Sequence, residues 1–550
     1  MVPELPVDRK TRNSHPKVRT GCLTCKIRHK KCDENYPFCR MCTRSKRTCE
    51  YKETPDKRTR ALRKESQVLP YLLSASASQY GPIARRLVDT SQIDLTPSER
   101  WYLDSFRRYT SHECAGYVKD DFWQRLVHQV SEEEPAVRHA AIAISAMHWR
   151  YARGLTGAEA GDSSVALSTF PSTLTAENDV YFPLRQCNKA IASLRQSLRI
   201  HATSSAQTEA VLVTCVVLVS LALFQEDTKT ATSHMRSGYQ LLVGWQKSGF
   251  DKSPSGPILM RTFADLHLHQ CTFRDPESSI QAAQMSLSRL ITTSPQVYGS
   301  VDALERGSDL LVTLGWIISA NYPRGLDKSM DLRFGINAAC PLNKKDGTQD
   351  TALERVQAWK SHLEAFVTRY GGILSPQHRH PLRLIEIWTE ITYVLAVVAN
   401  RPEQQEMAYD SLLPHFHRVN ELGKIYFESS ELMPRFAAKI TVMPAIFFVA
   451  QKCRDWRTRR EALHLIRSCR RREGVWTSSG NFAILDQLIR EESGGLTPDD
   501  VIPELARVDT IHIEHLPEQG KLRLWYHRLR SYESTGGTGH GIWKTALLPG

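Results

Sequence analysis

Six closely spaced cysteines near the N-terminus constrain the fold of this chain more than any other feature. They lie at Cys22, Cys25, Cys32, Cys39, Cys42 and Cys49, so the unit Cys-x2-Cys-x6-Cys occurs twice. Two cysteines three residues apart can bind one metal ion from a single turn, and thiolates are ligands of structural zinc. The doubled spacing therefore predicts a small metal-binding module at the start of the chain.

The N-terminal stretch of the sequence favours metal binding over disulfides for these cysteines. The N-terminal stretch MVPELPVDRKTRNSHPK is polar and lacks the apolar core of a secretory signal. We therefore expect a reducing compartment, where clustered cysteines bind metal.

Counting ligands predicts two zinc ions per chain. Each half of the repeat supplies three thiolates, whereas structural zinc takes four ligands. Six sulfurs can fill the eight ligand positions of two zinc ions if two of the sulfurs bridge. Two alternatives stay open: an iron–sulfur cluster, which ordinarily uses other spacings, and a single four-thiolate zinc site. That site would use Cys22, Cys25, Cys39 and Cys42 and leave Cys32 and Cys49 as bystanders.

The basic charge of the chain is concentrated around the same cysteines. The net charge is +13, and residues 1–65 carry +11 of it. A concentrated basic segment attracts phosphate polyanions, although a solvated basic arm has the same composition. Between the second and third cysteines lie Lys26, Arg28, His29, Lys30 and Lys31. Such side chains can donate to guanine O6 and N7 or contact phosphates, so the sequence predicts double-stranded DNA as a partner.

Residues 21–51, GCLTCKIRHKKCDENYPFCRMCTRSKRTCEY, resemble the DNA-binding domain of fungal zinc binuclear cluster transcription factors. All six cysteines fit, as do Asp33 after the third cysteine and Pro37 before the fourth. The resemblance implies that Cys22 and Cys39 bridge the two zinc ions. It also implies that the C-terminal end of the first short helix reads a GC-rich triplet, typically CGG, in the major groove. The terminal ligands implied are Cys25 and Cys32 for one zinc and Cys42 and Cys49 for the other.

One position departs from the family pattern. His29 stands where these domains often carry a base-contacting lysine. A neutral imidazole can donate one hydrogen bond to guanine but carries no full charge. The alternative is that His29 contacts phosphate or packs, while Arg28 or Lys30 reads the base.

From Thr96 onward the sequence is typical of helices. Thr96-Pro97-Ser98-Glu99 is a capping box with proline at the first helical position. Apolar residues then recur at helical spacing, and we expect further helices at Leu382–Ala399 and Ile440–Ala450. The apolar run Ala210–Phe224 is shorter than the ~20 residues of a membrane span, so we expect a buried core helix. Little of the sequence alternates as strands do.

Residues 97–250 resemble, less specifically, the fungal-specific transcription factor domain that follows such clusters. The resemblance rests on residues 99–117, 134–152 and 234–245, and it implies an all-helical regulatory region. We therefore expect a mostly α protein with a small two-zinc cysteine cluster, a flexible linker and a large all-helical regulatory region. The expected boundaries are 1–17, a disordered basic arm; 18–51, the cluster; 52–95, the linker; 96–532, the helical region; and 533–550, a disordered tail.

The sequence thus predicts a sequence-specific DNA-binding regulator of RNA polymerase II transcription in the nucleus, with transcription co-regulators as further partners and no membrane association. The linker lacks sustained heptads, so we expect DNA binding as a monomer or a homodimer formed through the helical region. Two other classes of protein fit the sequence less well. A zinc-dependent protein-interaction module on a helical scaffold is disfavoured by the basic run. An enzyme is disfavoured because no catalytic motif such as His-Glu-x-x-His or Gly-x-Ser-x-Gly is present.

Overall fold

A computed structural model of the chain describes residues 22–33, 39–45, 94–116, 120–156, 181–200, 205–247, 253–273, 348–372, 374–399, 402–428, 436–494, 496–497, 500–528 and 542–549. The chain divides into two compact units, Met1–Ala77 and Ser78–Gly550. The expected basic arm and almost all of the expected linker lie outside the described residues, so those two expectations stay predictions.

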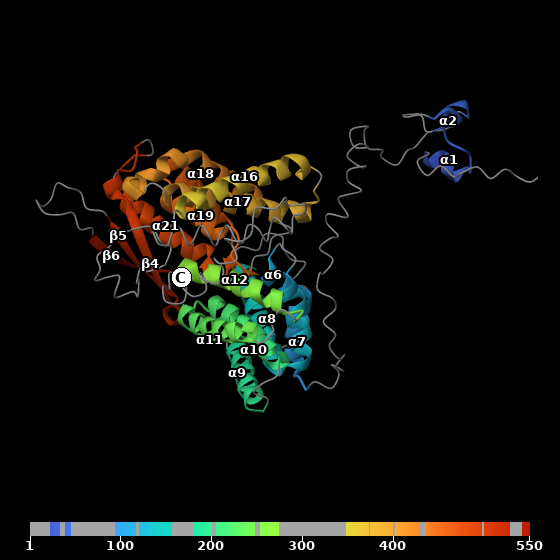
Figure 1. The fold of residues 1–550 in the computed structure, drawn as a ribbon, viewed down its shortest axis with the longest axis horizontal. Coiled ribbons are helices and arrows are strands. Elements are labelled where there is room, and N and C mark those ends of the chain that lie inside the picture. The colour runs from blue at the N-terminus through green and yellow to red at the C-terminus, as the bar shows by residue number, and fades with distance from the viewer. Residues whose placement is uncertain are drawn as a thin grey trace, which may run out of the picture. The chain divides into compact units, whose positions relative to one another are not determined.

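The described residues of the first unit form two short helices of equal length, α1 (Leu23–Ile27) and α2 (Arg40–Arg44). Each begins directly after a cysteine, and the two helices are labelled in Figure 1. The thiol of the preceding cysteine caps each helix: Cys22 accepts from the backbone of Cys25, and Cys39 accepts from that of Cys42. The sequence repeat is therefore also a repeat in structure.

The second unit begins with a group of helices that runs from blue to green in Figure 1. The expected capping box is present: the Thr96 hydroxyl accepts from Glu99 N at 3.3 Å, and the Glu99 carboxylate accepts from Thr96 N at 2.9 Å. The helices of this group are α5 (Pro97–Ser105), η2 (Phe106–Thr110), α6 (Ser111–Ala115), η3 (Phe122–Leu126), α7 (Val127–Glu133), α8 (Pro135–Thr156), α9 (Phe182–Ile200), α10 (Ser205–Phe224), α11 (Thr228–Lys247) and α12 (Gly256–Phe273).

Helix α10 lies at the centre of this group and is apolar on all sides. Its segment Ala206–Phe224 is long and apolar enough to cross a membrane, but 94% of its apolar window is buried inside the protein. A helix that is hydrophobic all round suits a protein interior. The prediction of a buried core helix is therefore confirmed.

A second group of helices follows, coloured yellow to orange in Figure 1. The predicted helices at 382–399 and 440–450 are confirmed within longer or slightly shifted elements. These helices are α16 (Thr348–Tyr370), α17 (Pro376–Ala399), η6 (Pro402–Leu412), α18 (Leu413–Glu428), α19 (Met443–Lys452), α20 (Trp456–Ser468), α21 (Ser478–Ser493) and η8 (Glu504–Ala506).

Two three-stranded sheets were not expected from the sequence. The small sheet has the order β1 (Phe436–Ala437), β2 (Arg472–Glu473), β3 (Trp476–Thr477). The larger one is an antiparallel meander, in which a turn with the short helix η9 (Pro517–Gln519) joins its first two strands. Its strands are β4 (Val508–Leu516), β5 (Lys521–Arg528) and β6 (Ile542–Pro549).

Strand β6 corrects the expectation of a disordered tail at 533–550. Residues 542–549 pair with all of β5, from Arg528 opposite Ile542 to Lys521 opposite Pro549. The strand also packs on α21 (Figure 1), and Lys544 forms an ion pair with Glu491 of that helix. The glycines before β6 suggested a tail, but the apolar residues after them complete a sheet. The protein is nonetheless mostly helical, as predicted.

Candidate metal centre and nucleic-acid interface

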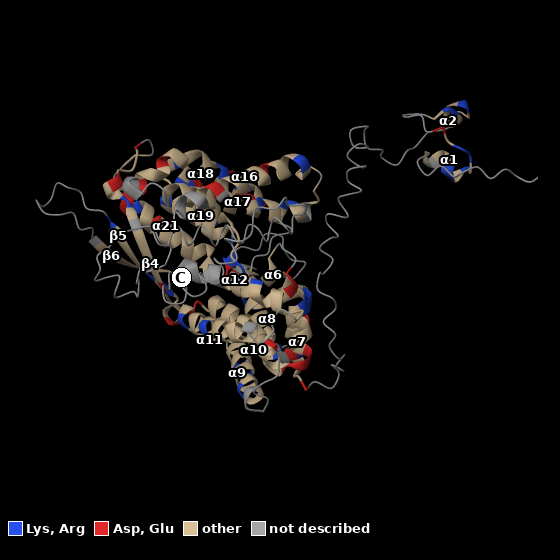
Figure 2. Cartoon of the chain, viewed as in Figure 1, with Lys and Arg blue, Asp and Glu red and all other residues tan. Residues whose placement is uncertain are grey.

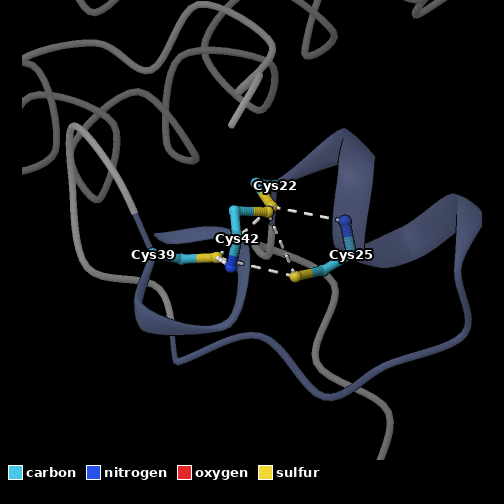
Figure 3. Close-up of side chains that lie close together, drawn as sticks. All are labelled: Cys22, Cys25, Cys39 and Cys42. Atoms are coloured by element: carbon cyan, nitrogen blue, oxygen red, sulfur yellow. Dashed lines mark hydrogen bonds between the residues drawn. The ribbon is translucent and has the colours of Figure 1, made fainter. Parts of the chain in front are cut away.

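Four sulfurs converge between α1 and α2, as Figure 3 shows. The Sγ atoms of Cys22, Cys25, Cys39 and Cys42 lie within 4.8 Å of one another, and all four side chains are buried. Cys22 Sγ lies 3.7 Å from both Cys39 Sγ and Cys42 Sγ. Cys25 Sγ lies 3.5 Å from Cys39 Sγ and 3.8 Å from Cys42 Sγ.

These spacings fit zinc. Four thiolates bound tetrahedrally at about 2.3 Å place their sulfurs about 3.8 Å apart, which is the separation observed between α1 and α2. Disulfides need about 2.0 Å between sulfurs, and all five described cysteines of the motif are free thiols. The donor set and its spacing therefore suit a zinc centre.

The fifth described cysteine lies beside the same four sulfurs. Cys32 is buried, and its sulfur accepts from the backbone amide of Cys22 at 3.4 Å. Its Sγ also lies within 4.8 Å of Cys39 Sγ in a second group of candidate ligands that includes Asp33. Cys32 thus approaches both Cys22 and Cys39. The sixth cysteine, Cys49, lies outside the described residues.

The thiols influence one another's protonation. Desolvation and hydrogen bonds from the neighbouring thiols raise the pKa of Cys25. Desolvation also acts to raise the pKa of Cys39, but hydrogen bonds from the backbone and side chain of Cys42 outweigh it and lower the value. Zinc requires deprotonated thiolates, so binding would release protons and stabilise the folded module.

The basic run after Cys25 forms the end of α1 and the turn behind it. Lys30 N donates to Cys25 O at 3.0 Å and His29 N donates to Lys26 O at 3.1 Å. This pair of bonds is a Schellman ending. It places His29 in the left-handed region, with φ of +52°, a conformation that favours glycine or asparagine. The turn leaves Lys26, His29, Lys30 and Lys31 exposed.

Arg28 differs from its neighbours. It is half-buried, and its Nη1 donates to Ser45 Oγ at 2.9 Å. This bond joins the end of α1 to the end of α2, so part of the Arg28 guanidinium serves the module itself. Of the five predicted DNA-contacting residues, the other four have the greater exposure.

Sequence reasoning missed basic residues on the second helix. Arg40 and Arg44 of α2 are exposed and, with Lys31, line a shallow open hollow beside Cys32 and Asp33. Figure 2 marks Lys and Arg in blue on both short helices. The Asp33 carboxylate accepts from Arg40 N at 3.0 and 3.2 Å. The signal was the repeat itself, because a second Cys-x2-Cys helix places basic residues beside the centre as the first does.

Comparison with known proteins agrees with this geometry. Residues 20–58 match the fungal Zn(2)-Cys(6) binuclear cluster domain, which binds two zinc ions through six cysteines. Residues 102–294 match the fungal specific transcription factor domain. No solved structure matches the chain.

The chain is also similar to curated regulators. It is 22% identical to the aspercryptin biosynthesis cluster-specific transcription regulator atnN of Emericella nidulans, over 86% of this chain and 87% of that protein. It is 53% identical over 38 residues to transcriptional regulatory protein pro1 of Neurospora crassa, and 56% identical over 34 residues to moc3 of Schizosaccharomyces pombe. Those two matches cover only 6% and 7% of the relatives' lengths.

The cysteine centre, its basic turn and the helical region define a zinc-dependent, sequence-specific DNA-binding regulator of transcription. The chain carries the fungal Zn(2)-Cys(6) binuclear cluster domain followed by the fungal specific transcription factor domain, and it is similar to fungal regulators with this cluster. These matches indicate a regulator rather than an enzyme.

Proposed function

We propose that the protein regulates RNA polymerase II transcription in the nucleus by reading a short GC-rich, CGG-like element through α1. The observation that carries the proposal is that the buried sulfurs of α1 lie directly behind its exposed basic end. Zinc would fix the helix, and the turn would present Lys26, His29, Lys30 and Lys31 to the groove. Basic side chains at guanine edges specify sequence, and the others hold phosphates.

The proposed ligand assignment has Cys22 and Cys39 as the bridging thiolates. Both stand at the first position of their half of the repeat, and each caps its own helix. Their sulfurs are 3.7 Å apart, and Cys32 lies near both of them. In this assignment Cys25 and Cys32 complete one zinc, and Cys42 and Cys49 complete the other.

The test is selection of bound sequences from a random duplex pool with the zinc-loaded full chain, followed by gel shifts on the recovered site. The double variant Lys30→Ala plus Lys31→Ala should lose binding, because two exposed cations leave the interface. The matched control is Arg418→Ala plus Lys424→Ala on α18, which removes equal charge from a helix of the other unit and should bind as the unaltered chain does. Equal binding by both double variants would count against the DNA assignment.

The same selection separates the competing class. If the module recognises protein, no duplex sequence is enriched, and zinc loading changes only protein capture. An enriched CGG-like triplet supports the proposed element, while another enriched sequence keeps the DNA-binding function and replaces the triplet.

A further inference from the structure

Helix α20 carries an exposed basic face in the C-terminal half of the helical region, outside both matched domains. Arg460, His464 and Arg467 are exposed and follow one another at spacings of four and three residues. Residues at such spacings share one side of an α-helix. The opposite side is buried through Ala462, Leu465 and Ile466, so the helix is anchored and the basic face points outward.

The two arginines are held by aromatic rings. The Arg460 guanidinium lies 4.4 Å from the ring centre of Trp456, and that of Arg467 lies 5.2 Å from the ring centre of Phe482. A stacked guanidinium keeps its N–H edge free for a planar anion and loses little conformational freedom on binding. Within the part of the chain that the structure describes, no carboxylate lies within ion-pair distance of Arg460 or Arg467.

On the neighbouring helices α18 and α21, exposed arginines form ion pairs with carboxylates. On α18, Arg418 pairs with Glu386 and Glu421, at 3.3 and 3.5 Å. On α21, Arg490 pairs with Asp486 at 2.6 Å. The one acidic residue on the exposed side of α20, Glu461, accepts from Asn420 of α18 at 3.1 Å. The basic face of α20 is thus left without the acidic partners that its neighbours have.

We infer that this face, Arg460 with His464 and Arg467, binds the phosphate backbone of duplex DNA outside the element read by the cluster. The inference rests on the proposed function, because the cluster brings DNA to the same chain and so raises its effective concentration at α20. Arginine suits phosphate through paired N–H donors. The contact carries no sequence preference and adds to affinity through release of counterions.

The test measures binding of the zinc-loaded full chain to two duplexes that contain the same selected site. One duplex ends just outside the site, and the other adds about three helical turns (~30 base pairs) of flank. The variant Arg460→Gln plus Arg467→Gln keeps polar side chains and removes two charges. On the long duplex, the slope of log affinity against log salt should fall by about two, since each phosphate contact contributes about 0.9. On the short duplex the slope should not change.

The control is Arg418→Gln plus Lys424→Gln on α18, where the cations are paired with acids, and it should leave both slopes unchanged. Equal unfolding temperatures of the two double variants establish that α20 still folds. Equal slopes for the unaltered chain and the α20 variant on the long duplex overturn the inference. So does specific capture of an acidic peptide that depends on Arg460 and Arg467 while the DNA slopes stay equal. Failure of the unaltered chain to bind either duplex would instead overturn the proposed function.

Discussion

Arg28 Nη1 donates a hydrogen bond to Ser45 Oγ at 2.9 Å, and the two residues occupy the same position in the two halves of the cysteine repeat. Each is the C-cap of its helix, α1 and α2. The Ser45 hydroxyl in turn donates to Met41 O at 2.7 Å. A hydrogen bond between the two helix ends therefore joins the two halves of the repeat, in addition to the sulfurs.

Replacing Ser45→Ala should loosen the module without removing a zinc ligand. The lost bond to a charged donor is worth about 1.5 kcal/mol, so zinc transfer to a competing chelator should be about tenfold faster. The rate is measured on the full chain with a chromogenic chelator. Thr43→Ala is the control, because the Thr43 hydroxyl donates to Cys39 O, the N-cap of its own helix, at 3.1 Å. Equal rates for the two variants would show that the Arg28 bond does not hold the halves together.

Cys32→Ser should distinguish two zinc ions from one. In a binuclear cluster Cys32 is a ligand, so the variant should bind fewer than two zinc ions per chain and lose DNA binding. In a single four-thiolate site Cys32 is a bystander, and zinc content should not change. Native mass spectrometry counts the ions. Cys187→Ser on α9, a half-buried thiol outside the cluster, should keep the full zinc content and DNA affinity.

His29 variants should separate backbone strain from DNA contact. With φ of +52°, His29→Gly suits the backbone, and zinc retention should be equal or higher. If the imidazole contacts DNA, the same variant should weaken binding about tenfold, the equivalent of one hydrogen bond at ~1.4 kcal/mol. His29→Lys should restore and tighten binding by adding a charge. Unchanged affinity in His29→Gly would assign base reading to a neighbour.

Glu99 should make the stability of the helical region depend on pH. Burial acts to raise its pKa, but hydrogen bonds from Lys189 (2.6 Å), Gln186 (2.8 Å) and Thr96 outweigh this and lower the pKa to about 2. A carboxylate with a lowered pKa stabilises the fold above its unfolded value of about 4.5, and this is lost as pH falls toward about 2. Glu99→Gln should therefore cost about 2–3 kcal/mol at pH 7.

The measurement for Glu99 is thermal unfolding of the full chain across this pH range. The gap between the unaltered chain and Glu99→Gln should narrow steadily below pH 4.5. The control, Glu421→Gln, removes an exposed partner of Arg418 at 3.5 Å and should change stability by less than about 1 kcal/mol. A gap that stays constant with pH would contradict the role given to the ionised carboxylate.

The elements with strong local signals were predictable from the sequence, whereas long-range pairings were not. The cysteine spacing and the Thr96 capping box depend on neighbours a few residues apart. The bond between Arg28 and Ser45 depends on two helices meeting, which spacing alone does not reveal. Strand β5 did offer a signal, since Leu522, Leu524 and Tyr526 alternate and are buried. Because this strand is short and glycines follow it, the sequence did not predict the three-stranded meander.

The buried charges near the sheet illustrate the same limit and give a last prediction. The Glu492 side chain is 1% exposed, and its Oε2 lies 2.6 Å from both Arg459 Nη1 and Arg507 Nη1. Its Oε1 accepts from Val508 N at 2.7 Å, at the start of β4. Residues from α20, α21 and β4 thus share one carboxylate, although no sequence pattern relates them.

Glu492→Gln should lower stability by about 3–5 kcal/mol, because the buried Arg459 guanidinium loses the charge that compensates it and Arg507 keeps only its pair with Glu406. Thermal unfolding of the full chain checks this, with an expected fall in Tm of several degrees. The adjacent Glu491→Gln is the matched control. Glu491 pairs with Arg528 and Lys544, whose side chains are 34% and 40% exposed. Solvent screens these pairs, so loss of the Glu491 charge should cost about 1 kcal/mol or less. Equal effects at the two positions would contradict the role given to the Glu492 carboxylate in joining β4 to the helices.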